Sequence, residues 1–146
     1  MQENLSNEPK NKKIKLDFKD SKYATGRRKK SIARVWVKKG SGNIYVNGKK
    51  MAEYFIKPML QIAVNRPLSI TERQNEFDVR CTVKGGGLTG QAGAIIHGMS
   101  RALVVFEPAL KSILKKENLT TRDSRAVERK KYGRRKARRS YQFSKR

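Results

Sequence analysis

The C-terminal segment, residues 120–146, constrains the fold most, because it has too few apolar side chains to build a core. Its 27 residues include twelve Lys and Arg residues and only two acidic ones. Burying so few apolar groups gains less free energy than ordering the segment costs in conformational entropy. We therefore expect an extended basic tail that becomes ordered on a partner.

The charge of the whole chain indicates the kind of partner. Among 146 residues there are 36 Lys and Arg and 12 Asp and Glu, a formal net charge of +24, which favours a polyanion. A basic segment is often only a solvated run of charge. This one, however, is rich in Arg and contains Tyr132, Tyr141 and Phe143. Guanidinium groups fork onto phosphates, and they and aromatic rings stack on bases, so nucleic acid is favoured.

The composition argues against several other classes of protein. Cys81 and His97 are each the single residue of their type, which excludes an internal disulfide and a cysteine zinc cluster and leaves little for a metal site. No apolar run reaches the length of about 18 residues that a membrane-spanning helix needs. Residues 1–22 lack the apolar stretch of a signal sequence and are expected to be a flexible polar extension. We expect no cofactor, no membrane partner and no catalysis.

Residues 23–119 have the patterning of one globular domain. Residues 31–38 are rich in β-branched and aromatic types and alternate between two faces, which predicts a strand. A turn at 40–43 leads to residues 44–46, which are expected to return beside that strand as a hairpin. The stretch from Tyr23 is expected to add a further strand to the same sheet.

The next segments predict short helices and another strand. Residues 51–65 are helix-prone but interrupted by Pro58, which predicts two short helices, and Pro67 is expected to end the second. Residues 77–83 alternate in polarity and predict a strand in which Cys81 is a small core residue.

The last part of the domain predicts two helices, from Gly90 to Glu107 and from Pro108 to about Lys116. With the strands they predict an α+β fold: a single two-layer domain, with a mixed β-sheet and helices on one face. On the longer helix, a stripe of larger apolar residues is expected to face the core, and the opposite face is expected to approach RNA closely because it is small as well as polar. A side chain at Gly98 should then leave the domain folded. The core stripe is Ala92, Ile95, Ile96, Met99, Leu103 and Phe106, and the opposite face is Gln91, Ala94, His97, Gly98 and Arg101.

Two further motifs suggest phosphate contacts. The sequence GGGLTGQAGA at residues 85–94 connects a strand to a helix, where backbone N–H groups are able to bind a phosphate. It lacks the Lys-Ser/Thr pair of a P-loop and the GxGxxG spacing of a dinucleotide site, and a plain tight turn is the alternative. Four consecutive cations at residues 27–30 are best explained by phosphate neutralisation, although such a run also resembles a nuclear-localisation signal.

Several long motifs resemble one family, the universal ninth protein of the small ribosomal subunit in its bacterial form. They are TGRRKKSIARV at 25–35, GNIYVNG at 42–48, RPL at 66–68, VKGGGLTGQAGAIIHGMSRAL at 83–103 and LTTRDSRAVERKKYGRRKARRSYQFSKR at 119–146. The resemblance covers nearly all of residues 23–146. Residues 1–22 match no part of the family pattern, and Ile96 stands where that pattern has a basic residue.

The resemblance implies a structural protein of the head of the small subunit, in the cytoplasm. Its partners would be 16S-type rRNA, neighbouring head proteins and peptidyl-site tRNA, whose anticodon stem-loop Ser144, Lys145 and Arg146 would contact. It also implies a left-handed βαβ crossover, against the usual right-handed rule. Together with the charge pattern, it predicts rRNA contacts at Arg27, Arg28, Lys29, Lys30, Gly85, Gly86, Gly87, Gln91, His97, Arg101, Arg122, Arg125, Arg129, Lys130, Lys131, Arg134, Arg135, Lys136, Arg138 and Arg139.

Two other hypotheses remain open at this point. A free-standing nucleic-acid compactor would use the same basic surface, but it needs neither the specific ending QFSKR nor a small-residue helix face. An enzyme built on the glycine-rich loop is the third. Sedimentation separates the first two, since a ribosomal protein travels with the small subunit and a compactor with DNA.

Overall fold

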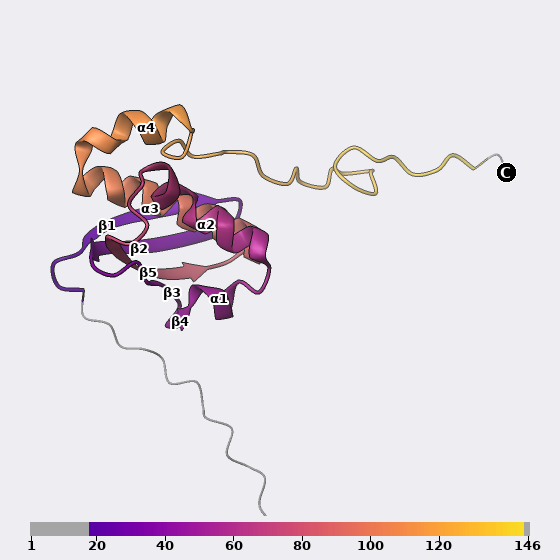
Figure 1. The fold of residues 1–146 in the computed structure, drawn as a ribbon. Helices are drawn as coiled ribbons and strands as arrows, with labels where there is room; N and C mark the ends of the chain where they lie inside the picture. The colour runs from indigo at the N-terminus through magenta and orange to yellow at the C-terminus, as the bar shows by residue number, and fades with distance from the viewer. Residues whose placement is uncertain (1–17, 145–146) are drawn as a thin grey trace, which may run out of the picture.

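The computed structural model describes residues 18–144 and shows five strands and their helices in one α+β domain (Figure 1). Residues 1–17, which belong to the expected N-terminal extension, and Lys145 and Arg146 lie outside the described residues. The elements are β1 (Lys22–Arg28), β2 (Ser31–Lys39), β3 (Ile44–Val46), β4 (Lys49–Lys50), α1 (Met51–Tyr54), α2 (Pro58–Ile70), β5 (Phe77–Lys84), α3 (Leu88–Phe106), a 3₁₀ turn (Pro108–Leu110) and α4 (Lys111–Lys116).

The sheet is mixed, with the strand order β1-β2-β5-β3-β4. β1 and β2 form an antiparallel hairpin, β2 pairs antiparallel with β5, and β3 pairs parallel with β5. The expected strand from Tyr23 and the mixed sheet are confirmed. The expected hairpin between residues 31–38 and 44–46 is wrong, because β5 lies between β2 and β3.

The loop that follows β2 explains why the hairpin does not form. Its backbone bonds to β5 and to the residue before it: Gly40 N–H donates to the Glu76 carbonyl, and the Asp78 carboxylate accepts from the N–H groups of Ser41 and Asn43, both at 2.9 Å. The chain therefore crosses over the end of β5 instead of turning back on β2. A turn-like sequence fixes the bend of the backbone locally, whereas the central partner of the next strand lies 35 residues away, as in the pair of Ile44 and Val79.

The core lies between the sheet and α2, α3 and α4, which lie on one side of it, while the short α1 sits beside β4 at the edge (Figure 1). Alternate residues of β2 and β5 point into it, and Phe77, Val79, Cys81 and Val83 are buried as the period-2 pattern predicts. Burial raises the pKa of the Cys81 thiol, which fits its predicted place in the core. Among residues 18–144, no helix has the length and apolar character needed to cross a membrane.

α2 differs from the expectation at its C-terminal end. Pro58 occupies its first turn, but the helix runs through Pro67 to Ile70, so the expected stop at Pro67 is wrong. A proline inside a helix removes one backbone hydrogen bond. Here Pro67 is buried, as are Val64 and Leu68, and its carbonyl accepts a hydrogen bond from the Thr71 hydroxyl at 2.9 Å. Apolar burial thus offsets the lost hydrogen bond.

α3 packs on β1 and β2 through its small residues, which corrects the predicted RNA-facing surface. Ala94 and Gly98 are buried, and a Cβ on Gly98 would lie 2.7 Å from Val35 Cγ2 and 3.0 Å from the Gly26 nitrogen. A Cβ on Gly26 would overlap the Ala94 carbonyl. The absence of side chains thus allows the helix backbone to approach the sheet, rather than RNA.

Because of the same packing, the buried face of α3 differs in part from the predicted core stripe. Ala92, Ile95, Met99 and Leu103 are buried as expected. Ile96 and Phe106 are only partly buried at its border, because the small residues turn the helix so that its buried arc is displaced.

Candidate nucleic-acid interface

The site that joins the domain to the basic tail centres on His97. Arg27 N–H donates to His97 Nδ1 at 3.2 Å, so the proton of the neutral ring is on Nε2, which donates to the Thr120 carbonyl at 3.2 Å. Burial lowers the pKa of His97, and the positive charges of Arg101 and Arg122 lower it further. A neutral His97 therefore bridges β1 to the first residue of the tail.

Arg28 makes the second connection between the domain and the tail. Its guanidinium contacts Asp123 Oδ2 at 3.0 Å and donates to the Arg125 carbonyl at 3.1 Å. Hydrogen bonds from Arg125, together with the charges of Arg125 and Arg28, lower the pKa of Asp123 to about 2. Leu119 is buried immediately before this point. We call the segment Leu119–Arg125, held in this way, the tail base.

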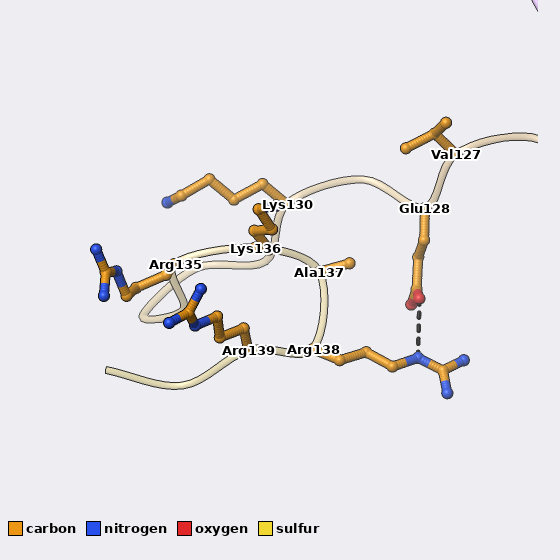
Figure 2. A pocket seen from close by; sticks show the side chains of 8 residues that line it. All are labelled: Val127, Glu128, Lys130, Arg135, Lys136, Ala137, Arg138 and Arg139. Atoms are coloured by element: carbon orange, nitrogen blue, oxygen red, sulfur yellow. Dashed lines mark hydrogen bonds and ion pairs between the residues drawn. The ribbon is translucent and has the colours of Figure 1, made fainter. Parts of the chain in front are cut away.

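Beyond the tail base, residues 126–144 contain no helix or strand and run away from the domain (Figure 1). Tyr132 and Val127 are almost fully exposed. Around Gly133 the chain folds back on itself: Arg135 N–H donates to the Arg139 carbonyl at 2.9 Å and Arg138 pairs with Glu128 at 3.0 Å. Figure 2 shows Arg138 turned toward Glu128, while the charged ends of Lys130, Arg135 and Arg139 point to the other side.

The glycine loop has a structural explanation at two of its three positions. Gly85 and Gly86 have positive φ angles of 75° and 63°. A Cβ on Gly85 would lie 2.6 Å from the Lys30 carbonyl, and one on Gly86 would overlap the Ser31 hydroxyl. Gly87 has open space around it and sits at the N-terminus of α3. The tight-turn interpretation thus accounts for Gly85 and Gly86, and a phosphate contact at the exposed Gly87 stays a prediction.

The other polar residues predicted on α3 are bound within the protein. Gln91 accepts the Tyr54 hydroxyl at 2.7 Å and donates to the Gly85 carbonyl at 3.2 Å. Arg101 donates to the Thr25 carbonyl at 2.7 Å. Arg101 is nevertheless exposed, whereas Gln91 is partly buried.

Most of the predicted cations of the domain and tail remain accessible. Arg27, Lys29 and Lys30 are exposed at the β1–β2 turn, and Ser144 is exposed at the end of the described chain. The exposed cations of the tail are Arg122, Arg125, Arg129, Lys130, Lys131, Arg134, Arg135, Lys136, Arg138 and Arg139. The predicted residues therefore form two groups, one at the β1–β2 turn beside the tail base and one along the tail.

Sequence reasoning missed the sheet face that points away from the helices. It carries Tyr23, Arg34, Trp36 and Arg80 close together. The alternation of residues 31–38 already places Arg34 and Trp36 on one face of the strand. That β5 brings Arg80 beside Trp36 follows only from the strand order.

These features define a class, the basic α+β domains that carry a cationic chain held at its base by the domain. Residues 26–146 match the family model described as Ribosomal protein S9/S16. The chain belongs to this family, and the resemblance seen in the sequence is confirmed. It is therefore a structural protein of the ribosome that serves translation rather than an enzyme, and the family supports a place in the small subunit with RNA and other ribosomal proteins as partners.

Proposed function

We propose that this protein binds small-subunit rRNA in the head of the cytoplasmic ribosome and contacts peptidyl-site tRNA with the end of its tail. Residues 23–119 would be the docked domain and residues 120–146 the extended tail. The observation that carries the proposal is the tail base: the domain fixes residues 119–125 and leaves the following cations exposed. The proposal includes the left-handed crossover from β3 through α2 to β5 that the family implies.

The electrostatics support rRNA as the partner of the domain and tail. Exposed Lys and Arg side chains that neutralise phosphates release counterions, and this release supplies sequence-independent affinity. The free chain has few acidic groups with which to neutralise them: Asp123 and Glu128 are the two carboxylates of the tail. Phosphate contacts position a protein on RNA without reading sequence, which suits a structural role.

Incorporation into small subunits tests the proposal. Cells carrying tagged full-length protein should show it in the small-subunit fraction of a sucrose gradient, and this signal should persist after DNase treatment. As a matched pair, replacement of Arg28 and His97 by Ala should reduce incorporation more than replacement of Lys111 and Lys115, which are exposed on α4. Sedimentation with DNA would overturn the proposal in favour of a compactor.

A further inference from the structure

The face of the sheet opposite the helices carries a row of aromatic and cationic side chains. Tyr23 pairs with Trp36 across β1 and β2, Trp36 with Arg80 across β2 and β5, and Arg80 with Tyr45 across β5 and β3. Residues directly opposite one another point to the same face. α2, α3 and α4 lie on the other side of the sheet (Figure 1). The row crosses four strands, a width of about 14 Å at 4.7–4.9 Å per strand.

The rings and guanidinium groups of this row lie in direct contact. The Tyr23 and Trp36 ring centroids are 5.3 Å apart. The Arg34 guanidinium lies 5.1 Å from the Trp36 ring and 5.8 Å from the Tyr23 ring, and that of Arg80 lies 5.6 Å from Trp36. Tyr23 is 45% exposed even so. The contacts orient the rings and hold positive charge against them; both guanidinium groups lie over Trp36, which is partly exposed, so Tyr23 offers the more accessible ring.

The charge of this face points to an anionic occupant. Among the strand residues, Asp78 is the single carboxylate on the open face, and two backbone N–H groups of the neighbouring loop already bind it. The cations on the same face are Arg27, Arg34, Lys38, Lys50, Arg80 and Lys84. Tyr, Trp and Arg also occur in protein–protein interfaces, but six cations beside one carboxylate that is already bonded give this face a positive potential, which favours a polyanion.

We propose that this open face binds unpaired RNA nucleotides, with bases stacked on Tyr23 and Trp36 and their phosphates beside Arg34 and Arg80. Stacking needs an accessible base face, which a duplex does not offer. RNA-recognition sheets of similar width stack two or three bases on their aromatic residues. The inference rests on the proposed RNA-binding function but adds a second site, on a different face from the tail base.

The single tryptophan of the chain makes the site observable. Trp36 emission should be quenched when the full-length protein is titrated with a short unpaired adenosine oligonucleotide, because a stacked base quenches indole fluorescence. Two control ligands, an RNA duplex of the same length and inorganic polyphosphate, should bind the tail without quenching the Trp36 emission. Anisotropy of labelled oligonucleotide, measured in parallel, reports binding anywhere on the protein. Binding without quenching overturns this inference alone, whereas no binding at all overturns the proposed function as well.

Three substitutions distinguish the contribution of the Tyr23 ring to RNA binding from contributions made elsewhere on the protein. Tyr23→Leu should weaken the affinity obtained from Trp36 quenching about 5- to 150-fold, which corresponds to about 1–3 kcal/mol per stacked base. Tyr23→Phe keeps the aromatic ring and should retain the wild-type affinity, although this variant loses the hydrogen bond between the Tyr23 and Thr25 hydroxyl groups. Tyr132→Leu makes the same change on the exposed tail and should leave the Trp36 isotherm unchanged. Equal isotherms for Tyr23→Leu and wild type would overturn the inference.

Ultraviolet cross-linking of assembled small subunits tests the site in place. The peptide that contains Trp36 should carry a nucleotide after nuclease digestion. If that peptide were instead joined to another protein, the occupant would be a protein and the inference would be wrong. Circular dichroism of each variant verifies that the domain is folded, and the wild-type quenching result decides the question even if Tyr23→Leu does not fold.

Discussion

Gly98 and Gly26 set the distance between α3 and the sheet. Gly98→Leu should destabilise the domain by about 1–3 kcal/mol or prevent folding, since overpacking forces the backbones apart. Its Cβ alone would approach Val35 Cγ2 to 2.7 Å. Gly87→Leu is the matched control, because nothing lies within 4 Å of its Cβ and its φ of −108° suits any residue. Urea unfolding followed by circular dichroism measures both, and equal stability of the two variants would contradict the packing described.

His97 should respond to pH at the tail base. Its pKa is lowered by burial, so the unfolded chain binds the proton more readily than the folded one. The stability contributed by the neutral ring is therefore complete above the unfolded value of about 6.5 and decreases as the pH falls below it. Because this is the single histidine, its ring C2–H resonance gives the pKa directly. Arg122→Ala should raise that pKa, and a wild-type value at or above 6.5 would refute the assignment.

At the level of elements, the tail base is the joint between domain and tail. Asp123→Ala should loosen residues 120–125 with little loss of global stability, because exposed ion pairs contribute about 0–1 kcal/mol. Backbone ¹⁵N relaxation should show lower order parameters there. Glu128→Ala removes an equivalent carboxylate, bound to Arg138 farther along the tail, and should leave residues 120–125 unchanged. An unaltered tail base in Asp123→Ala would show that the ion pair between Arg28 and Asp123 does not hold it.

The part of the tail beyond its base should account for much of the salt dependence of rRNA binding. Each neutralised phosphate contributes roughly −0.7 to −0.9 to the slope of log affinity on log salt. Deleting residues 126–146 should reduce the slope by about 4 to 5 units if about six of their cations contact phosphate. Filter binding across a salt series measures it. An unchanged slope would show that the tail does not bind phosphates.

The elements that could be predicted are those whose signal is local. Alternation identified β5, and helical periodicity placed α3 within two residues of its start. The position of β5 beside β2 was not predictable in this way, because pairing joins segments distant in the sequence. The prediction that Gly98 faces RNA was wrong for a related reason. A small residue in a sequence shows that the helix approaches something closely, but not whether this is RNA or the strand that contains Gly26. At the candidate interface, the exposure of the tail cations could be predicted from their charge, and their contacts with RNA stay a prediction, whereas the bonds of Arg28 and His97 to the tail base required the fold.

For the whole molecule, a fixed tail base limits how far the tip can reach. The residues after Arg125 span about 70 Å when fully extended at 3.3–3.6 Å per residue. Removing Ser144–Arg146 should speed dissociation of peptidyl-site tRNAs irrespective of their sequence, while subunits still assemble, because phosphate contacts carry no sequence information. Dissociation rates of several tRNAs from subunits with full-length or truncated protein measure this. Neutralising Lys29 and Lys30 removes as many cations at a remote turn and should leave the rates unchanged. Equal rates for truncated and full-length protein would contradict the assignment of the tip.

The central place of β5 in the sheet also bears on how the chain folds as it is synthesised. β1 and β2 can pair as soon as they leave the ribosome, and β3 can pair with β4, but neither pair joins the other until β5 has emerged, more than thirty residues after β3. Until then, the inner edge of β2 and the apolar face of the hairpin are exposed to other nascent chains. Non-local pairing of this kind slows folding. Newly made copies should therefore depend on prompt delivery to RNA or on chaperones, and a pause in translation before residue 77 should promote their aggregation.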